Sequence, residues 1–202
     1  MRRVVIATAL LAGAWTLPAL AALPQGSAAP DFTAQASLAG KEFKFALKDA
    51  LKKGPVVVYF YPSAFTGGCN LQAHTFAENM DKFKAAGASV IGVSEDSITR
   101  LNAFSSDPQY CAGKLPVASD ADGKIAKSYD IKVFDARPGM KDSRGVDIDH
   151  GFAERTTFIV TPDGKVAATI GGMQMSPTDN VAKSLETVQQ LAGAKSGGKA
   201  GG

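Results

Sequence analysis

The stretch YPSAFTGGCN, residues 61–70, holds one of the two cysteines of this 202-residue chain. Cys69 follows two glycines and comes shortly after the apolar run VVVYF, residues 56–60. The thiolate is the nucleophilic form of cysteine, and the start of a helix is one of the places where proteins stabilise it. The spacing therefore predicts a reactive thiol held where a strand gives way to a helix. A structural disulfide between Cys69 and Cys111 is the alternative.

A helix is predicted directly after the cysteine, from Asn70 to Ala86. Its apolar residues recur with helical spacing and form one face: Ala73, Phe76, Ala77, Met80 and Phe83. Gly87 suits the C-terminal end of this helix. Cys69 then lies over the apolar side of the first turn. Backbone N–H groups without helical partners and the positive end of the helix dipole lie there, and both favour a thiolate.

Three residues around the thiol carry a resemblance to a known family. Pro62, Thr66 and Cys69 match the P-x-x-x-T-x-x-C signature of the peroxiredoxins. The similarity spans roughly residues 29–172, through the stretches AAPDFTAQ, GASVIGVSEDS and RTTFIVTPDGKV. The layout most resembles the bacterioferritin comigratory protein or PrxQ group. That resemblance implies a thioredoxin-like fold and a thiol peroxidase acting on hydrogen peroxide and organic hydroperoxides.

The resemblance also implies a role for each catalytic residue. Cys69 would attack the peroxide and become a sulfenic acid. Thr66 would donate a hydroxyl hydrogen bond to the thiolate or the peroxide, and Pro62, which lacks an N–H, would screen the pocket. Arg155 precedes the strand TTFIV as the family's arginine does, and it would orient the peroxide. The alternatives are that Thr66 is an ordinary turn residue and that Arg155 forms a surface ion pair with Glu154.

The thiol that recycles the enzyme departs from the family pattern. Many PrxQ-like proteins have a resolving cysteine five residues after the reactive one, where this chain has His74. Five helical residues leave His74 about 140° around the helix from Cys69, which favours a solvated histidine. Cys111 is the candidate that resolves the sulfenic acid by an intramolecular disulfide, after local unwinding of the helix. A bystander Cys111 with an external resolving thiol stays open.

Other thioredoxin-like functions need residues at positions that hold something else here. A C-x-x-C oxidoreductase needs a second thiol where Gln72 stands, and a C-x-x-x-C copper chaperone needs one where Ala73 stands. Neither His74 nor His150 has a second cysteine nearby, so we predict no metal and no cofactor. A periplasmic binding protein or metal chaperone without peroxidase activity remains an alternative, because a fold alone does not fix function.

Short β-branched and aromatic runs alternate with helical stretches along the chain. Strands are predicted at 56–61, 89–94 and 156–160, and the turn TPDG joins the last of these to 165–171 in a hairpin. Helices are predicted at 47–53, 70–86, 97–105, 124–129 and 179–191. This alternation predicts an α/β domain with a mixed central sheet flanked by helices, in agreement with the thioredoxin-like fold that the resemblance implies.

The N-terminal sequence has the pattern of an export signal. Arg2 and Arg3 precede an apolar run at 4–17 and small residues at 19–21, which predicts a signal peptide over residues 1–21. The run is shorter than the roughly 20 apolar residues of a spanning helix. We therefore expect a periplasmic or secreted protein with a linker at 22–29, one domain at 30–194 and a disordered tail at 195–202.

The charge balance limits the kinds of partner. Removal of residues 1–21 takes away two arginines and no acidic residue, so 22 basic residues against 19 acidic ones become 20 against 19. A nearly neutral domain without basic and aromatic interleaving argues against nucleic acid. The expected partners are a peroxide and a thiol reductant such as a thioredoxin-like protein, with no membrane contact after signal cleavage. A monomer and a homodimer both fit.

Overall fold

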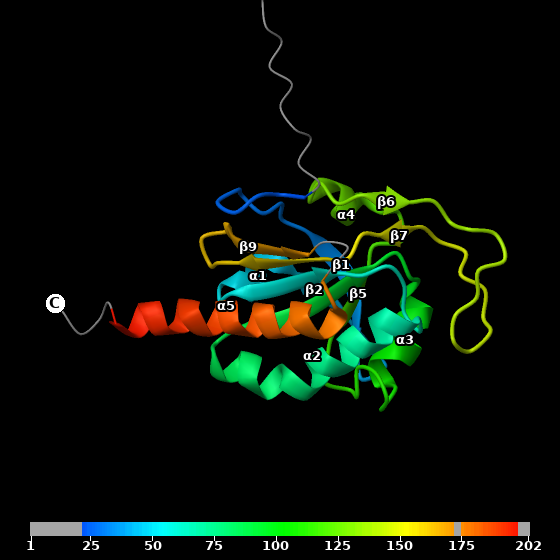
Figure 1. Ribbon diagram of the computed structural model, residues 1–202, viewed down its shortest axis with the longest axis horizontal. Helices are drawn as coiled ribbons and strands as arrows, with labels where there is room; N and C mark the ends of the chain where they lie inside the picture. Colours follow the sequence, from blue (N-terminus) through cyan, green and yellow to red (C-terminus); the bar gives the residue numbers. More distant parts are fainter. Residues whose placement is uncertain (1–21, 172–174, 198–202) are drawn as a thin grey trace, which may run out of the picture.

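Seven strands form one mixed sheet in the order β2-β1-β5-β4-β3-β8-β9 (Figure 1). The computed structural model describes residues 22–171 and 175–197. In the sheet, β3 (Val56–Phe60) pairs parallel with β4 (Ser89–Ser94) and antiparallel with β8 (Thr156–Val160). These are three of the four strands predicted from the sequence, and the predicted α/β class with a mixed central sheet is confirmed.

The other strands complete the sheet or lie beside it. The fourth predicted strand is β9 (Val166–Gly171). The predicted hairpin is present, since β9 pairs antiparallel with β8 across the TPDG turn. The remaining strands are short or half-exposed and carry little periodic signal: β1 (Thr33–Leu38), β2 (Lys41–Ala46), β5 (Val117–Ser119), β6 (Val133–Phe134) and β7 (Phe152–Ala153). The pair β6 and β7 forms a separate two-stranded sheet.

Five helices in the described residues match the five predicted ones, with shifts at their ends. Their bounds are α1 (Leu47–Leu51), α2 (Gly67–Ala85), α3 (Ile98–Ser106), α4 (Lys124–Ser128) and α5 (Pro177–Gly197). The most consequential shift is at α2, which begins three residues before the predicted Asn70. Cys69 is therefore inside the first turn and not in front of it.

Buried side chains lie on both faces of the sheet. Along β3, Val57 and Tyr59 join the core under α2, α3 and α5, whereas Val58 and Phe60 join the core on the opposite face. Side chains of a strand alternate between faces, so a strand buried on both sides reads as a continuous apolar run. Figure 1 shows α2 and α5 together on one side of the sheet, with α4 on the other.

A glycine cap ends helix α2. Gly87 has a φ of +74°, and its N–H donates to the Lys84 carbonyl at 2.9 Å, while Ala88 N–H donates to the Phe83 carbonyl at 2.9 Å. This pair of bonds is the Schellman motif, which needs a left-handed residue that glycine supplies without strain. The glycine predicted to suit the helix end therefore takes that place.

Both predicted flexible ends differ in part from the structure. The predicted linker at 22–29 is attached to the domain, because Gly26 N–H donates to the Val166 carbonyl at 2.8 Å and Ala29 N–H to the Gly164 carbonyl at 2.8 Å. These bonds pair the segment with the start of β9 and with the turn that precedes it. Helix α5 continues to Gly197, beyond the predicted helix end at residue 191 and into the predicted tail. Once a helix has formed, each added residue gains a backbone hydrogen bond even where no apolar stripe is present. The predicted signal peptide and residues 198–202 of the predicted tail lie outside the described residues.

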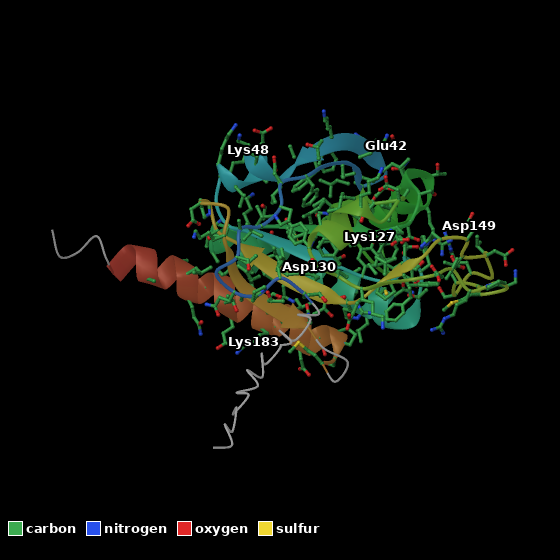
Figure 2. The ribbon with its side chains drawn as sticks, turned by 90° about the horizontal axis from the view of Figure 1, so that it is seen from above. Glu42, Lys48, Lys127, Asp130, Asp149 and Lys183 are labelled. Atoms are coloured by element: carbon green, nitrogen blue, oxygen red, sulfur yellow. The ribbon has the colours of Figure 1, made fainter. Side chains whose placement is uncertain are left out.

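Charges of both signs lie on exposed positions of separate elements. Figure 2 labels Glu42, Lys48, Asp130, Asp149 and Lys183, all of them exposed.

Among the residues that the structure describes, no helix is long and apolar enough to cross a membrane.

Candidate active site

Cys69 is the third residue of α2 and is buried, with 3% of its surface exposed. Thr66 takes the N-cap position with extended backbone, and its carbonyl accepts the Asn70 N–H at 2.8 Å. The first turn contains no acidic residue, so no nearby carboxylate offsets the positive end of the helix dipole. Exposed Gly67 and Gly68 leave the N–H groups of this turn open to a small ligand. The backbone thus offers hydrogen-bond donors beside a buried sulfur.

Arg155 contacts the thiol directly. Its Nη2 atom donates to Cys69 Sγ at 3.3 Å, and its Nη1 atom donates to Gln72 Oε1. In the described part of the chain, Arg155 forms no ion pair with Glu154, so the surface-pair alternative is not the one seen. The guanidinium therefore places a permanent positive charge against the sulfur.

A buried polar chain holds Arg155 in this orientation. Gln72 Nε2 donates to Asn180 Oδ1 at 3.0 Å, and Thr157 Oγ1 donates to the same oxygen at 2.7 Å. Asn180 Nδ2 in turn donates to the Ile170 carbonyl at 3.1 Å. Gln72, Thr157 and Asn180 are all buried, so each polar group requires its partner. Helix α5 therefore supports the arginine through Gln72.

Thr66 and Pro62 lie in the loop between β3 and α2. The Thr66 hydroxyl donates to the Ser63 carbonyl at 2.8 Å and not to the sulfur, in contrast to the predicted donation, because its single hydrogen is used within the loop. Toward a bound peroxide, Thr66 Oγ1 is left to accept a hydrogen bond. Half-buried Pro62 follows β3 and brings no N–H to compete for the sulfur.

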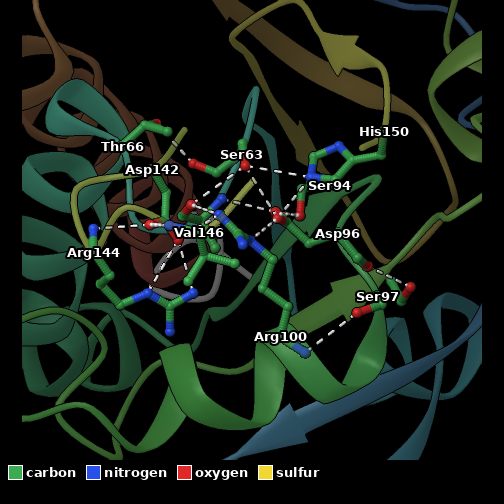
Figure 3. A network of polar contacts seen from close by, with 12 residues as sticks. Ser63, Thr66, Ser94, Asp96, Ser97, Arg100, Asp142, Arg144, Val146 and His150 are labelled. Carbon is green, nitrogen blue, oxygen red and sulfur yellow. Dashed lines mark hydrogen bonds and ion pairs between the residues drawn. The ribbon is translucent and has the colours of Figure 1, made fainter. Parts of the chain in front are cut away.

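We call residues 62–66, between β3 and α2, the active-site loop. An ionic network that includes Asp96 and Arg100 holds this loop in place (Figure 3). Asp96 Oδ2 accepts the Ala64 N–H at 2.7 Å, and Asp96 Oδ1 accepts the Ser63 hydroxyl at 3.1 Å. Arg100 Nη2 donates to the Ala64 carbonyl at 3.1 Å. Arg100 Nε lies 2.8 Å from Asp96 Oδ1 as an ion pair without a directed hydrogen bond. The loop backbone is held at both ends of Ala64.

The segment between β6 and β7 reaches the same loop. Asp142 accepts from Arg100 Nη2 at 2.7 Å and from Arg144 Nη2 at 2.8 Å. The Arg144 guanidinium lies over the Phe65 ring, 3.2 Å from its centre, and Ser143 N–H donates to the Phe65 carbonyl at 2.9 Å. Phe65 has a φ of +60°, which is rare for a bulky residue and requires such support.

Cys111 is fully buried in the turn that follows α3. Both cysteines are free, and they belong to the same core cluster. Burial, with a smaller contribution from Asp107, raises the pKa of the Cys111 thiol well above its ordinary value. Cys111 is therefore a neutral thiol in this state, and it must gain solvent access before it can act as a nucleophile.

The two histidines occupy different surroundings. His74 lies on α2 with 43% of its side chain exposed, and its Nε2 atom lies 3.4 Å from Glu78 Oε1. Its Nδ1 atom is buried and has no hydrogen-bond partner among the described residues, so the side chain is only partly solvated. His150 is half-buried against Asp96 in the network behind the active-site loop. Within residues 22–171 and 175–197, no three His, Cys, Asp or Glu side chains are grouped to hold a metal ion.

The network was missed by the sequence reasoning, which assigned no role to Arg100, Arg144 or His150. One signal was available for Asp96. It follows β4, which pairs parallel with β3, and the carboxyl ends of neighbouring parallel strands meet at one edge of a sheet. Polar residues directly after β4 thus lie beside the loop that follows β3. The long segment between β6 and β7 carries no comparable signal.

Comparisons with known proteins agree with this site. Residues 25–169 match the AhpC/TSA family. Chloroplastic peroxiredoxin Q of Oryza sativa subsp. japonica is 32% identical over 201 residues, which cover 91% of this chain and 81% of the relative.

Solved structures of this kind share the fold. The peroxidoxin BcpB of Mycobacterium tuberculosis is 27% identical with a TM-score of 0.67, covering 84% of this chain and 98% of that one. The bacterioferritin comigratory protein of Xanthomonas campestris is 26% identical with a TM-score of 0.60, covering 78% and 91%. These neighbours confirm the thioredoxin-like fold. The chain belongs to the AhpC/TSA family and is a peroxidase of the peroxiredoxin type, similar to peroxiredoxin Q.

Proposed function

We propose that the protein reduces hydrogen peroxide and organic hydroperoxides with Cys69 as the attacking thiolate. The observation that carries this proposal is the 3.3 Å contact between Arg155 Nη2 and Cys69 Sγ at the start of α2. The Xanthomonas campestris relative is described as having alkyl peroxide reduction activity, which supports the substrate class.

The chemistry follows from the groups that surround the sulfur. The Cys69 thiolate attacks the hydroxyl oxygen of the hydroperoxide, the O–O bond breaks, and its electron pair leaves on the other oxygen. Arg155 and the N–H groups of the first turn of α2 stabilise the charge that develops on these oxygens. Thr66 Oγ1 accepts the hydrogen of the attacked hydroxyl. The leaving oxygen takes up a proton as water or alcohol, and Cys69 becomes a sulfenic acid.

Cys111 then resolves the sulfenic acid. Its sulfur attacks Cys69 Sγ, the sulfenic hydroxyl leaves as water, and an intramolecular disulfide forms. Because Cys111 is fully buried, this step needs a local opening of the active-site loop and of the first turn of α2. A thiol reductant such as a thioredoxin-like protein returns both sulfurs to thiols.

We also propose that the protein is exported, with residues 1–21 removed as a signal peptide. Arg2, Arg3, the apolar run and the small residues at 19–21 support this. Mass spectrometry of protein recovered from the periplasm or medium should give an N-terminus at Ala22. Protein that retains Met1 in the cytoplasm would contradict export.

Peroxide consumption with dithiothreitol tests the proposed activity. We expect turnover of hydrogen peroxide and an organic hydroperoxide, abolished by Cys69→Ser. The Cys111→Ser variant is the matched control, since it should still reduce one equivalent of peroxide in a single turnover. Unchanged turnover in Cys69→Ser protein would remove Cys69 from the mechanism.

A further inference from the structure

His150 places both of its ring nitrogens against hydrogen-bond acceptors (Figure 3). Nε2 lies 2.8 Å from Asp96 Oδ1 and 3.3 Å from Ser63 Oγ, and Nδ1 lies 2.7 Å from the Gly151 carbonyl oxygen. A neutral imidazole has one N–H, so it can donate to Asp96 or to the Gly151 carbonyl but not to both. The geometry therefore suits the doubly protonated imidazolium.

The charged groups around His150 come from two directions. Asp96 and Glu95 face it from the segment between β4 and α3, and Arg100 faces it from α3. Burial alone would lower the pKa of His150, but the hydrogen bond and charge of Asp96 and the Gly151 carbonyl outweigh burial and the charge of Arg100, so the pKa is raised. Burial raises the pKa of Glu95, and the charge of His150 opposes that rise.

Asp96 connects this imidazolium to the active-site loop. The same carboxylate that pairs with His150 accepts from Ala64 N–H at 2.7 Å and from the Ser63 hydroxyl at 3.1 Å. Burial alone would raise the pKa of Asp96, but His150 together with the Ser94 and Ala64 hydrogen bonds lowers it. The Asp96 carboxylate thus bridges the histidine and the loop backbone.

The same loop covers the segment that holds Cys111. The Phe65 ring packs edge-on against Phe104, with ring centres 5.0 Å apart, and against Tyr110, with ring centres 5.6 Å apart. Tyr110 directly precedes the buried Cys111. Outward movement of Phe65 therefore uncovers the turn that carries this thiol.

We propose that His150 and Asp96 form a pH-sensitive latch that holds the active-site loop closed, and that loss of one proton from His150 releases it. Both are positioning residues, since they contact the loop and not the Cys69 sulfur. The proposed function is needed only to connect opening of the loop with attack by Cys111 on the sulfenic acid.

The direction of the pH effect follows from the raised pKa of His150. Its charged form contributes fully to the closed loop below the ordinary histidine pKa of about 6.5. That contribution is lost as the pH rises through the value in the folded protein. The loop is therefore closed in acid and opens more often in alkali.

Hydrogen exchange of the backbone amides of residues 63–71 tests the latch. Cys69→Ser protein is used as the background, so that the reactive thiol takes no part in the measurement. After correction for intrinsic exchange rates, His150→Gln should speed exchange about tenfold at pH 5.5 and remove the pH dependence up to pH 8.5. His74→Gln, which changes the other histidine, should behave as the parent. Equal exchange in the His150→Gln variant and the parent at both pH values would overturn the latch.

A second measurement needs no change at His150. In His74→Gln protein, NMR can follow the titration of the single remaining imidazole, that of His150. The pH midpoint of this titration is then compared with the pH midpoint of hydrogen exchange in the loop. Coincident midpoints support the latch. Loop protection that stays constant while His150 titrates would overturn it.

Alkylation of Cys111 separates the latch from the resolving role. At pH 6 in the Cys69→Ser background, His150→Gln should speed Cys111 alkylation by iodoacetamide about tenfold, and His74→Gln should not. If His150→Gln protein shows this faster alkylation but, with both cysteines intact, forms no Cys69–Cys111 disulfide after peroxide, the latch stands and the resolving role fails. Equal alkylation rates in the two variants would contradict the latch.

Discussion

Arg155 Nη2 lies 3.3 Å from Cys69 Sγ, although the two residues are 86 positions apart in the sequence. The sheet explains the contact. Thr156, the first residue of β8, pairs with Phe60, the last residue of β3. Arg155 is therefore delivered to the edge of the sheet where the chain leaves β3 and enters α2.

Removal of the guanidinium should slow the peroxide reaction strongly. We expect Arg155→Gln to lower the second-order rate constant of Cys69 with hydrogen peroxide by about 10²–10³-fold, because a charged donor to the reacting atoms is lost. Arg155→Lys keeps the charge without the forked geometry, so its rate constant should lie between those of the parent and Arg155→Gln. Stopped-flow kinetics of the reduced protein measure these rates. Arg137→Gln, at an exposed position, is the control, and a parent-like rate in Arg155→Gln would exclude the arginine from the reaction.

Loss of the Asn180 side chain should affect both stability and rate. Asn180→Ala leaves buried Gln72 and Thr157 without their shared acceptor, at a cost of about 1–3 kcal/mol in the free energy of unfolding. It also loosens Arg155, which should slow the peroxide reaction by up to about 10²-fold. Urea unfolding and stopped-flow kinetics measure the two effects. Gln190→Ala, exposed on the same helix, should change neither.

A methyl group at Gly92 should strain the core beneath the site. A Cβ atom there would lie 2.6 Å from Tyr59 Oη, and the Tyr59 ring is stacked on Phe76 with ring centres 4.5 Å apart. We expect Gly92→Ala to lower the free energy of unfolding by about 1–3 kcal/mol. Gly193→Ala is the control, since its Cβ would meet no atom within 4 Å beyond its chain neighbours and the backbone of its own helix. Equal denaturant midpoints for the two variants would show that Tyr59 yields without cost.

Asp142 should contribute to stability at neutral pH and lose that contribution in acid. Burial alone would raise the pKa of Asp142, but hydrogen bonds from Arg144 and from the Val146 and Arg144 N–H groups, with the charge of Arg100, lower it. A lowered folded pKa gives stability that is present above about pH 4 and lost as the pH falls through the folded value. Between pH 5 and pH 3, the free energy of unfolding of Asp142→Asn should therefore fall less steeply than that of the parent.

The elements with long apolar signals were predictable from the sequence. Strands β3, β4 and β8 are buried at nearly every position, and the stripe on α2 gives a helical period, so their positions follow from local patterns. Strands β5, β6 and β7 have two or three residues and show no usable period. Their place is set by partners distant in the sequence.

The candidate site divides in the same way. Pro62, Thr66 and Cys69 lie within one short stretch, whereas the partners of the loop come from beyond it. Gln72 gains its role from Asn180 on α5, and Asp96 gains its role from His150, 54 positions away. Such pairs depend on tertiary folding and leave no spacing to recognise in a single sequence.

A disulfide map after treatment with one equivalent of peroxide tests the central claim most directly. Non-reducing peptide mass spectrometry of the wild-type protein should find a Cys69–Cys111 bond, formed through a sulfenic acid on Cys69. Cys111→Ser protein should stop at that sulfenic acid. Wild-type protein in which Cys69 remains a sulfenic acid and Cys111 a free thiol would contradict the resolving role. A sulfenic acid on Cys111 with Cys69 unmodified would contradict the whole account.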